Sequence, residues 1–102
     1  MIVEFDAQLW EWSARSDSWT FVSLPVDDSE EIRELMAGFD SPRRGFGSVR
    51  VRARIGTTTW QTSIFPDRGR AAYVLPVKRA VRSAEGLKVG DTTSVTIELL
   101  DL

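Results

Sequence analysis

The chain has 102 residues, of which 42% are hydrophobic and 27% are charged, and its formal net charge is −2 at pH 7. This length indicates one domain that can bury a core without disulfides, and the composition is typical of a globular protein. There is no cysteine and no histidine. The sequence therefore lacks the commonest ligands of transition metals and the usual nucleophile and base pairs, so we expect no metal, no cofactor and no enzymatic activity.

The N-terminal residues 1–6 contain no basic segment and no long apolar run, unlike a signal peptide. No stretch of the chain approaches the ~18 apolar residues of a membrane span. We therefore expect a cytoplasmic protein without a membrane partner.

The predicted elements of the first half are two strands, a helix and a third strand. Period-two alternation predicts a strand over residues 3–10, and aromatic and β-branched residues predict its return over 19–24. A helix with Asp28 as its N-cap follows and ends at Gly38. The strand over 48–55 alternates aliphatic residues with arginines. The apolar face of the helix comprises Ile32, Leu35, Met36 and Phe39.

The second half repeats this order of elements. Strands are predicted over residues 58–65 and 71–75, and Pro76 suits the first position of a helix that Gly86 ends. A last alternating strand covers residues 92–100. The apolar face of this second helix comprises Val77, Ala80, Val81 and Ala84.

Two segments of the chain have similar sequences. Residues 21–26 (Phe-Val-Ser-Leu-Pro-Val) and 73–77 (Tyr-Val-Leu-Pro-Val) each lead into a helical pattern, and Pro76 lies 51 positions after Pro25. An internal repeat of this kind determines the fold. We predict a mainly β protein: a six-stranded double-split closed barrel from two β-β-α-β repeats, about 2–56 and 57–101, capped by two short helices.

Three segments of the chain carry a resemblance to a known family. The sequence from Phe5 to Leu99 resembles the domain-of-unknown-function family nineteen-oh-five. This resemblance implies a double-split β-barrel, found alone or fused to other small domains, with no established activity and no catalytic residues to assign. The segments are Trp19-Thr20-Phe21-Val22 with Leu24-Pro25, Thr62-Ser63-Ile64-Phe65-Pro66, and Leu75-Pro76-Val77-Lys78 through Val81-Arg82 with Gly86-Leu87 and Gly90-Asp91.

The last of these segments is also similar to AbrB-type swapped-hairpin DNA-binding domains. Those domains are about half this length and reach the same barrel by dimerising, whereas here both halves lie in one chain. The likeness implies shared architecture and not shared DNA binding, because function has to be argued from a site.

A row of arginines is the first candidate site. Arg50, Arg52 and Arg54 point to one side of their strand, and arginine binds phosphates and carboxylates through its planar fork of donors. The simpler interpretation is that the row pairs with Glu4 and Asp6 on the polar face of the first strand, because opposite charges on paired strands attract.

Two tryptophans form the second candidate site. Trp10 and Trp12 fall on the polar face of the first strand, where exposed aromatic rings mark a ligand groove or a subunit contact. Alternatively, the strand ends there and both rings pack under the polar turn over residues 13–18. We expect Trp19 and Trp60 to pack in or over the core.

Cations near the second helix form the third candidate site. Lys78 and Arg82 are i, i+4 neighbours, and Arg79 lies beside them. Cations near the start of a helix are unfavourable for the helix dipole, which makes Lys78 and Arg82 candidate anion ligands. A solvated helix face is the simpler interpretation.

Charge is unevenly distributed along the chain. Residues 1–42 carry 2 basic and 10 acidic side chains, whereas residues 43–88 carry 11 basic and 2 acidic ones. Such asymmetry can mark an anion or nucleic-acid surface, or it can reflect acidic and basic segments on neighbouring strands.

Together these features predict a non-catalytic binding or interaction module, monomeric or homodimeric, whose partner is a small anionic ligand or a protein. The alternative is an AbrB-like nucleic-acid-binding protein that uses the basic segment 43–88, although the acidic overall balance argues against a dominant basic face. An enzyme acting on small anionic substrates would need a carboxylate or lysine that titrates near neutral pH.

Overall fold

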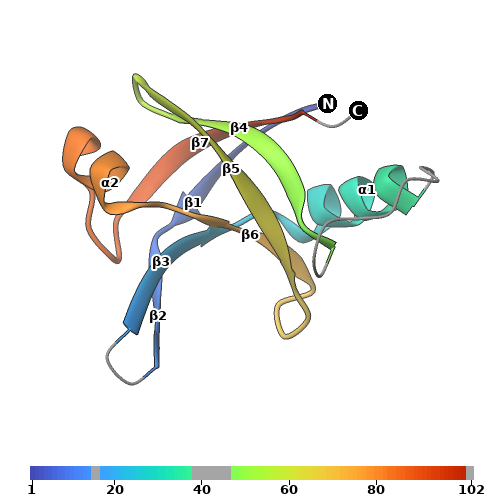
Figure 1. The fold of residues 1–102 in the computed structure, drawn as a ribbon, viewed down its shortest axis with the longest axis horizontal. Coiled ribbons are helices and arrows are strands. Elements are labelled where there is room, and N and C mark those ends of the chain that lie inside the picture. Colours follow the sequence, from blue (N-terminus) through green and yellow to red (C-terminus); the bar gives the residue numbers. More distant parts are fainter. Residues whose placement is uncertain (15–16, 38–46, 101–102) are drawn as a thin grey trace.

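The computed structural model describes residues 1–14, 17–37 and 47–100, and within them the protein is predominantly β (Figure 1). One antiparallel sheet has the strand order β1-β7-β4-β5-β6-β3-β2, and two helices accompany it. The strands are β1 (Ile2–Gln8), β2 (Trp10–Ala14), β3 (Asp17–Ser23), β4 (Val49–Ile55), β5 (Thr58–Asp67), β6 (Ala72–Pro76) and β7 (Thr92–Leu99), and the helices are α1 (Val26–Ala37) and α2 (Arg79–Glu85).

The sheet curls into a half-barrel whose two end strands, β1 and β2, are consecutive in the chain (Figure 1). Leu9 separates them: its N–H donates to the Asp91 carbonyl at 2.9 Å, and its carbonyl accepts from Gly90 N–H at 2.8 Å. The chain pairs with β7 before Leu9 and with β3 after it. The prediction of a six-stranded closed barrel is therefore wrong in its strand count and in its closure, because the sheet has seven strands and forms a half-barrel. Alternation continues through Leu9 and gives no sign of the change of partner.

The fifth strand changes partner in a similar way. Its residues Thr58 to Ile64 pair with β4, and its residues from Phe65 onward pair with β6. Pro66 stands opposite Tyr73, whose carbonyl accepts from Leu24 N–H on the β3 side. Because N–H and carbonyl groups of one strand residue point to the same side, the Pro66–Tyr73 pair exchanges no ladder bonds, and the missing proline N–H costs nothing there.

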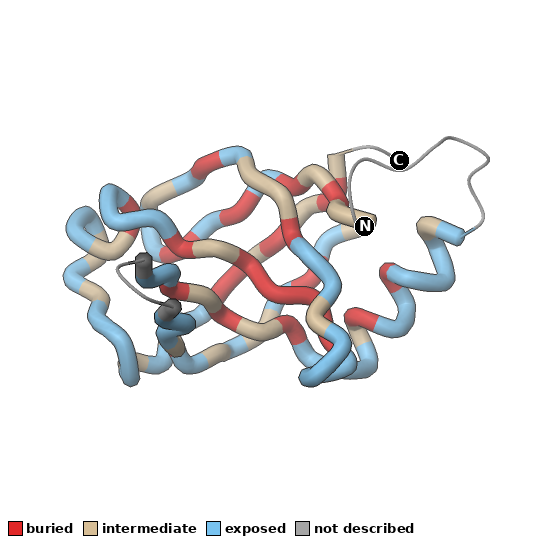
Figure 2. The backbone as a smooth tube through the Cα atoms, turned by 60° about the horizontal axis from the view of Figure 1, so that its bottom comes forward, coloured by how far each residue is buried: buried red, intermediate tan, exposed pale blue. Residues whose placement is uncertain are grey.

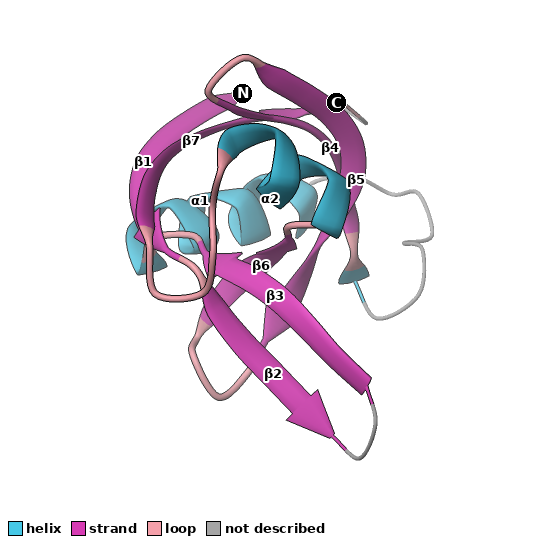
Figure 3. Cartoon of the chain, turned by 90° about the vertical axis from the view of Figure 1, so that its left-hand side faces the viewer, coloured by secondary structure: helices cyan, strands magenta, loops and turns pink. Residues whose placement is uncertain are grey.

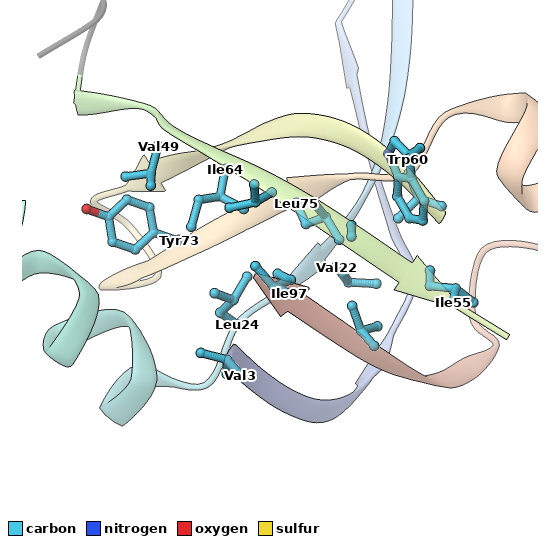
Figure 4. Packing of buried hydrophobic residues seen from close by; sticks show 14 of the residues in the cluster. Val3, Val22, Leu24, Val49, Ile55, Trp60, Ile64, Tyr73, Leu75 and Ile97 are labelled. Atoms are coloured by element: carbon cyan, nitrogen blue, oxygen red, sulfur yellow. The ribbon is translucent and has the colours of Figure 1, made fainter. Parts of the chain in front are cut away.

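The core lies inside the curl, where aliphatic side chains of all parts of the sheet meet (Figure 4). Along β4 the aliphatic residues are buried, as their alternation predicts, whereas Arg52 and Arg54 are exposed. Figure 2 shows the buried positions along the strands and mostly exposed positions along α1 and the turns. Side chains at most 1% exposed include Leu9, Val22, Ile32, Val51, Ile55, Ile64, Leu75, Val81 and Ile97.

The first helix begins earlier than its acidic residues suggest. It starts at Val26, directly after Pro25, so Asp28 lies in the first turn and is not the N-cap. Ile32 is fully buried, but Leu35 is 37% exposed because the helix touches the sheet along a narrower stripe than its apolar face predicts. The predicted contact of Phe39 and the predicted stop at Gly38 lie outside the described residues.

The second helix begins later than predicted. Pro76 is the last residue of β6, and Val77 N–H continues the ladder to the Thr20 carbonyl at 2.9 Å, so the helix starts at Arg79 with Lys78 as its N-cap. Gly86 ends the helix at φ 66° with its N–H bonded back into the last turn, as predicted.

Fewer of the apolar residues predicted for the second helix are buried than the sequence pattern suggests. Of its four predicted apolar positions, only Val77 and Val81 are buried. The two helices lie at opposite ends of the curled sheet (Figure 1), and Ile32 of α1 and Val81 of α2 belong to the same core. Neither α1 nor α2 has the length and apolarity that crossing a membrane requires, within the ranges that the structure describes.

Candidate functional site

The β2–β3 hairpin projects from the body of the protein (Figure 3). Its register places aromatic residues on one face. The register places Trp12 opposite Trp19 and Trp10 opposite Phe21. Since side chains alternate between the two faces of a strand, these four rings share the outer face of the hairpin.

The apolar face continues across the two neighbouring strands. Phe21 stands opposite Pro76 on β6, and Val74 of β6 stands opposite Phe65 on β5. The result is an open hollow of about 510 Å³, which we call the aromatic groove. It is lined by Trp10, Trp12, Trp19, Phe21, Phe65, Pro66, Asp67, Arg68, Val74 and Pro76.

Trp10 is the fixed centre of the aromatic groove. Its Nε1–H donates to Ser23 Oγ at 2.9 Å, and its ring centroid lies 5.1 Å from that of Phe21. The Arg70 guanidinium carbon stands 3.8 Å from the Trp10 centroid, in cation–π geometry. A hydrogen bond, an aromatic neighbour and a cation thus hold this ring in place.

Three other rings remain open to solvent. Trp12 is 50% exposed, Trp19 is 55% exposed and Phe65 is 40% exposed. The predicted core position is therefore correct for Trp60, which is 8% exposed, but wrong for Trp19. Trp19 is paired with Trp12 on the part of the hairpin that extends beyond the core, so no layer covers it.

The sequence-predicted cations Lys78 and Arg82 lie next to the aromatic groove. Together with Arg79 they line a smaller hollow of about 240 Å³, and Trp19 and Pro76 belong to the lining of both hollows. Arg82 Nε donates to the Val77 carbonyl at 3.1 Å, whereas the Lys78 side chain makes no capping hydrogen bond.

A second cationic group stands at the other end of β6, in the turn before it. Arg68 lines the aromatic groove, and Arg70 covers Trp10 while its Nε lies 3.4 Å from Asp67 Oδ2. Asp67 also accepts from Gly69 N–H at 3.0 Å. Arginines therefore flank the groove at the end opposite to Lys78.

The arginine row on β4 has other partners than those predicted. Arg52 pairs with Glu98 of β7 at 2.6 Å, and the predicted partners Glu4 and Asp6 lie one strand further away, because β7 separates β1 from β4. Arg50 Nη1 lies 3.5 Å from Ser63 Oγ, and Arg54 Nε donates to the Gly56 carbonyl at 3.0 Å. None of the three lines the aromatic groove or the neighbouring hollow.

This surface combines exposed aromatic rings with cationic side chains. Indole and phenyl faces stack on planar groups, and guanidinium and ammonium groups attract anions. Within the described ranges no group of three or more Asp and Glu side chains is placed to hold a metal ion. Of the candidate residues, Trp10, Trp12, Lys78 and Arg82 come together here with Trp19, whereas Arg50, Arg52 and Arg54 lie apart.

The fold and this surface define a small, mainly β protein with an exposed aromatic groove between two groups of cations. The chain belongs to the family described as Domain of unknown function (DUF1905), whose model matches residues 5–97. The resemblance of the sequence to this family is thus confirmed. No curated protein matches the sequence.

Proposed function

We propose that this protein is a non-catalytic binding module whose ligand occupies the aromatic groove. The observation that carries the proposal is the convergence of Trp12, Trp19 and Phe65, each at least 40% exposed, on one hollow. Leaving three large rings in water is unfavourable, and contiguous exposed aromatic surface is typical of binding sites.

The ligand is anionic in part. Two cationic groups flank the groove, one before β6 with Arg68 and Arg70 and one after it with Lys78 and Arg79. Asp67 is the one carboxylate in the two linings, and Arg70 lies within ion-pair distance of it. This imbalance of charge supports a partner that combines planar or apolar groups with negative charge.

The internal duplication is the architectural part of the proposal. The two Leu-Pro corners meet in the sheet: Val22 pairs with Leu75, and Leu24 N–H donates to the Tyr73 carbonyl at 2.9 Å. Each corner leads into a helix. This reciprocal antiparallel pairing supports two repeats, over about 2–56 and 57–101, related by an approximate dyad between β3 and β6.

The alternative function is AbrB-like binding of duplex DNA through the basic segment 43–88. The exposed guanidinium groups of Arg52 and Arg54 favour it, but Glu98 neutralises Arg52. Retardation of a duplex that weakens steeply with salt would support this alternative, and no retardation at low salt would remove it.

The test of the binding module is an NMR titration that follows the indole N–H signals. Naphthoate and acidic tryptophan-containing peptides are the anionic aromatic probes, and naphthylmethylamine is the matched cationic probe. We expect the anionic probes to shift the signals of Trp12 and Trp19 and to leave the signal of buried Trp60 unchanged.

The variant Trp12→Ala should weaken the affinity, followed by the Trp19 signal, about fivefold or more, because stacking of one ring contributes roughly 1 kcal/mol. The control is Val89→Ala, which alters an exposed apolar side chain outside both linings. Equal shifts with cationic and anionic probes, or none with either, would contradict the proposal.

A further inference from the structure

We propose that the ligand of the aromatic groove is single-stranded nucleic acid, with bases stacked on the open rings and phosphates beside the flanking cations. This inference rests on the proposed function and names its ligand.

The rings offer faces on which bases can stack. Trp19 and Phe21 lie nearly parallel, with an interplanar angle of 16° and centroids 6.4 Å apart, and both stand beside the half-exposed Trp12. Base–aromatic stacking is tolerant of sequence because every base has a π-face. Three exposed rings suit several successive bases better than one planar ligand.

The cations are spaced along the direction that the bound nucleic acid would follow. Arg68 and Arg70 precede β6, and Lys78 and Arg79 follow it, so the five-residue strand separates the two groups by roughly 17 Å at about 3.3 Å per residue. The β3–β6 register, continued by the Val77–Thr20 hydrogen bond, brings Lys78 alongside Trp19. A backbone lying across the rings would thus meet positive charge at both ends.

The same features disfavour other ligands with this chemistry. A duplex keeps its bases stacked on one another and presents no free base faces to Trp12 or Trp19. A free nucleotide would reach the cations of one end only, since the other group lies beyond β6. An acidic peptide has the charge but few planar groups, and it is therefore an outcome of the test.

The experiment measures fluorescence anisotropy of a labelled oligothymidylate of about 12 nucleotides, a length within the range of common single-strand sites. The same strand annealed to its complement and a polyglutamate peptide serve as competitors. We expect the single strand to bind, its duplex to compete at least tenfold more weakly, and the affinity to fall at least tenfold between about 50 and 200 mM salt.

Ring variants test the stacking. Trp12→Leu and Trp19→Leu keep an apolar side chain but remove the planar face, and each should weaken binding about tenfold or more, because stacking contributes about 1–3 kcal/mol per base. Circular dichroism and the melting temperature of each variant establish that the hairpin is still folded.

The two lysines of the chain form a matched pair for the charge test, since both are exposed. Lys78→Gln should reduce the salt dependence by about 0.7 in the slope of log K against log salt, and Lys88→Gln, outside both linings, should leave that slope unchanged.

Two outcomes overturn this inference and leave the binding module standing: a single strand that does not bind while polyglutamate or naphthoate does, and binding that Trp12→Leu and Trp19→Leu leave unaffected. A third outcome overturns both proposals. If sedimentation gives a dimer in which Trp12 and Trp19 are protected from acrylamide quenching, the groove is an interface between copies of this chain.

Discussion

At the scale of single residues, Ser29 joins the first helix to the sheet. Its side chain is fully buried in α1, and its Oγ accepts a hydrogen bond from Tyr73 N–H at 2.9 Å, 44 positions along the chain. If β3 were longer, one of its backbone carbonyls would accept a hydrogen bond from this N–H. However, β3 ends at Ser23, and Pro25 turns the chain into α1. The hydroxyl replaces the missing backbone acceptor.

We predict that Ser29→Ala lowers the free energy of unfolding by about 1–3 kcal/mol, because it leaves the buried Tyr73 N–H without an acceptor. Urea denaturation measures the loss, and hydrogen exchange of the Tyr73 amide should accelerate. The control is Ser94→Ala, whose exposed hydroxyl bonds to Asp6 and should change stability by less than about 0.5 kcal/mol. Equal effects of the two substitutions would argue against this role of Ser29.

At the scale of elements, the β4–β5 turn and α2 are fitted together at Gly56. Thr58 Oγ1 donates to Glu85 Oε2 at 2.6 Å, which ties the start of β5 to the last turn of α2. Gly56 adopts a φ of +58°, and a Cβ at this position would overlap the Glu85 carboxylate. The turn therefore needs glycine for its backbone conformation and for the close approach of the helix.

We predict that Gly56→Ala destabilises the protein by about 1–3 kcal/mol, because it adds left-handed strain and displaces Glu85 from Thr58. In a Glu85→Ala background the same substitution should cost less, but the cost should not vanish because the strain in φ persists. Gly69→Ala is the control: Gly69 has no positive φ and room for a Cβ, so little change is expected. A cost independent of Glu85 would contradict the proposed contact. Thermal denaturation of the four variants measures these differences.

Most elements follow from local patterns in the sequence, whereas partner changes do not. Alternation located β4 and β7 to within a residue at each end, and Gly86 located the end of α2. The division at Leu9 was not predictable, because the residue keeps its inward parity and only its hydrogen-bond partners change. Pro76 was misplaced for a related reason: proline suits both the end of a strand and the start of a helix.

At the scale of the whole molecule, the candidate site depends on pairings between distant parts of the chain. Alternation along the strand identified Trp10 and Trp12 as outward-facing. Lys78 and Arg82 were identified as candidates because they lie near the start of a helix. That these groups share Trp19 and Pro76 follows from the β2–β3 and β3–β6 registers, which no single segment reveals. Phe65 was missed because its strand was expected to end there, and the strand continues to Asp67.

The charged side chains of the acidic and basic segments mainly face solvent and not each other. Acidic β1 neighbours β7 and not the arginines of β4, so the acidic N-terminal and basic central segments do not pair across these strands. Among the described residues the ion pairs are Arg52–Glu98 and Arg70–Asp67, each with both side chains at least 33% exposed. Pairs of this kind contribute about 0–1 kcal/mol each.

We therefore predict that added salt affects stability and ligand binding very differently. Between about 50 and 200 mM salt the free energy of unfolding should change by less than about 1 kcal/mol, since exposed ion pairs contribute little and screen easily. Glu98→Gln, which removes the partner of Arg52, should have an effect of similar size. Over the same salt range, binding of the oligothymidylate should fall at least tenfold. A loss of stability above about 2 kcal/mol would mean instead that attraction between the acidic and basic segments holds the fold together, and that the central cations are engaged within the chain.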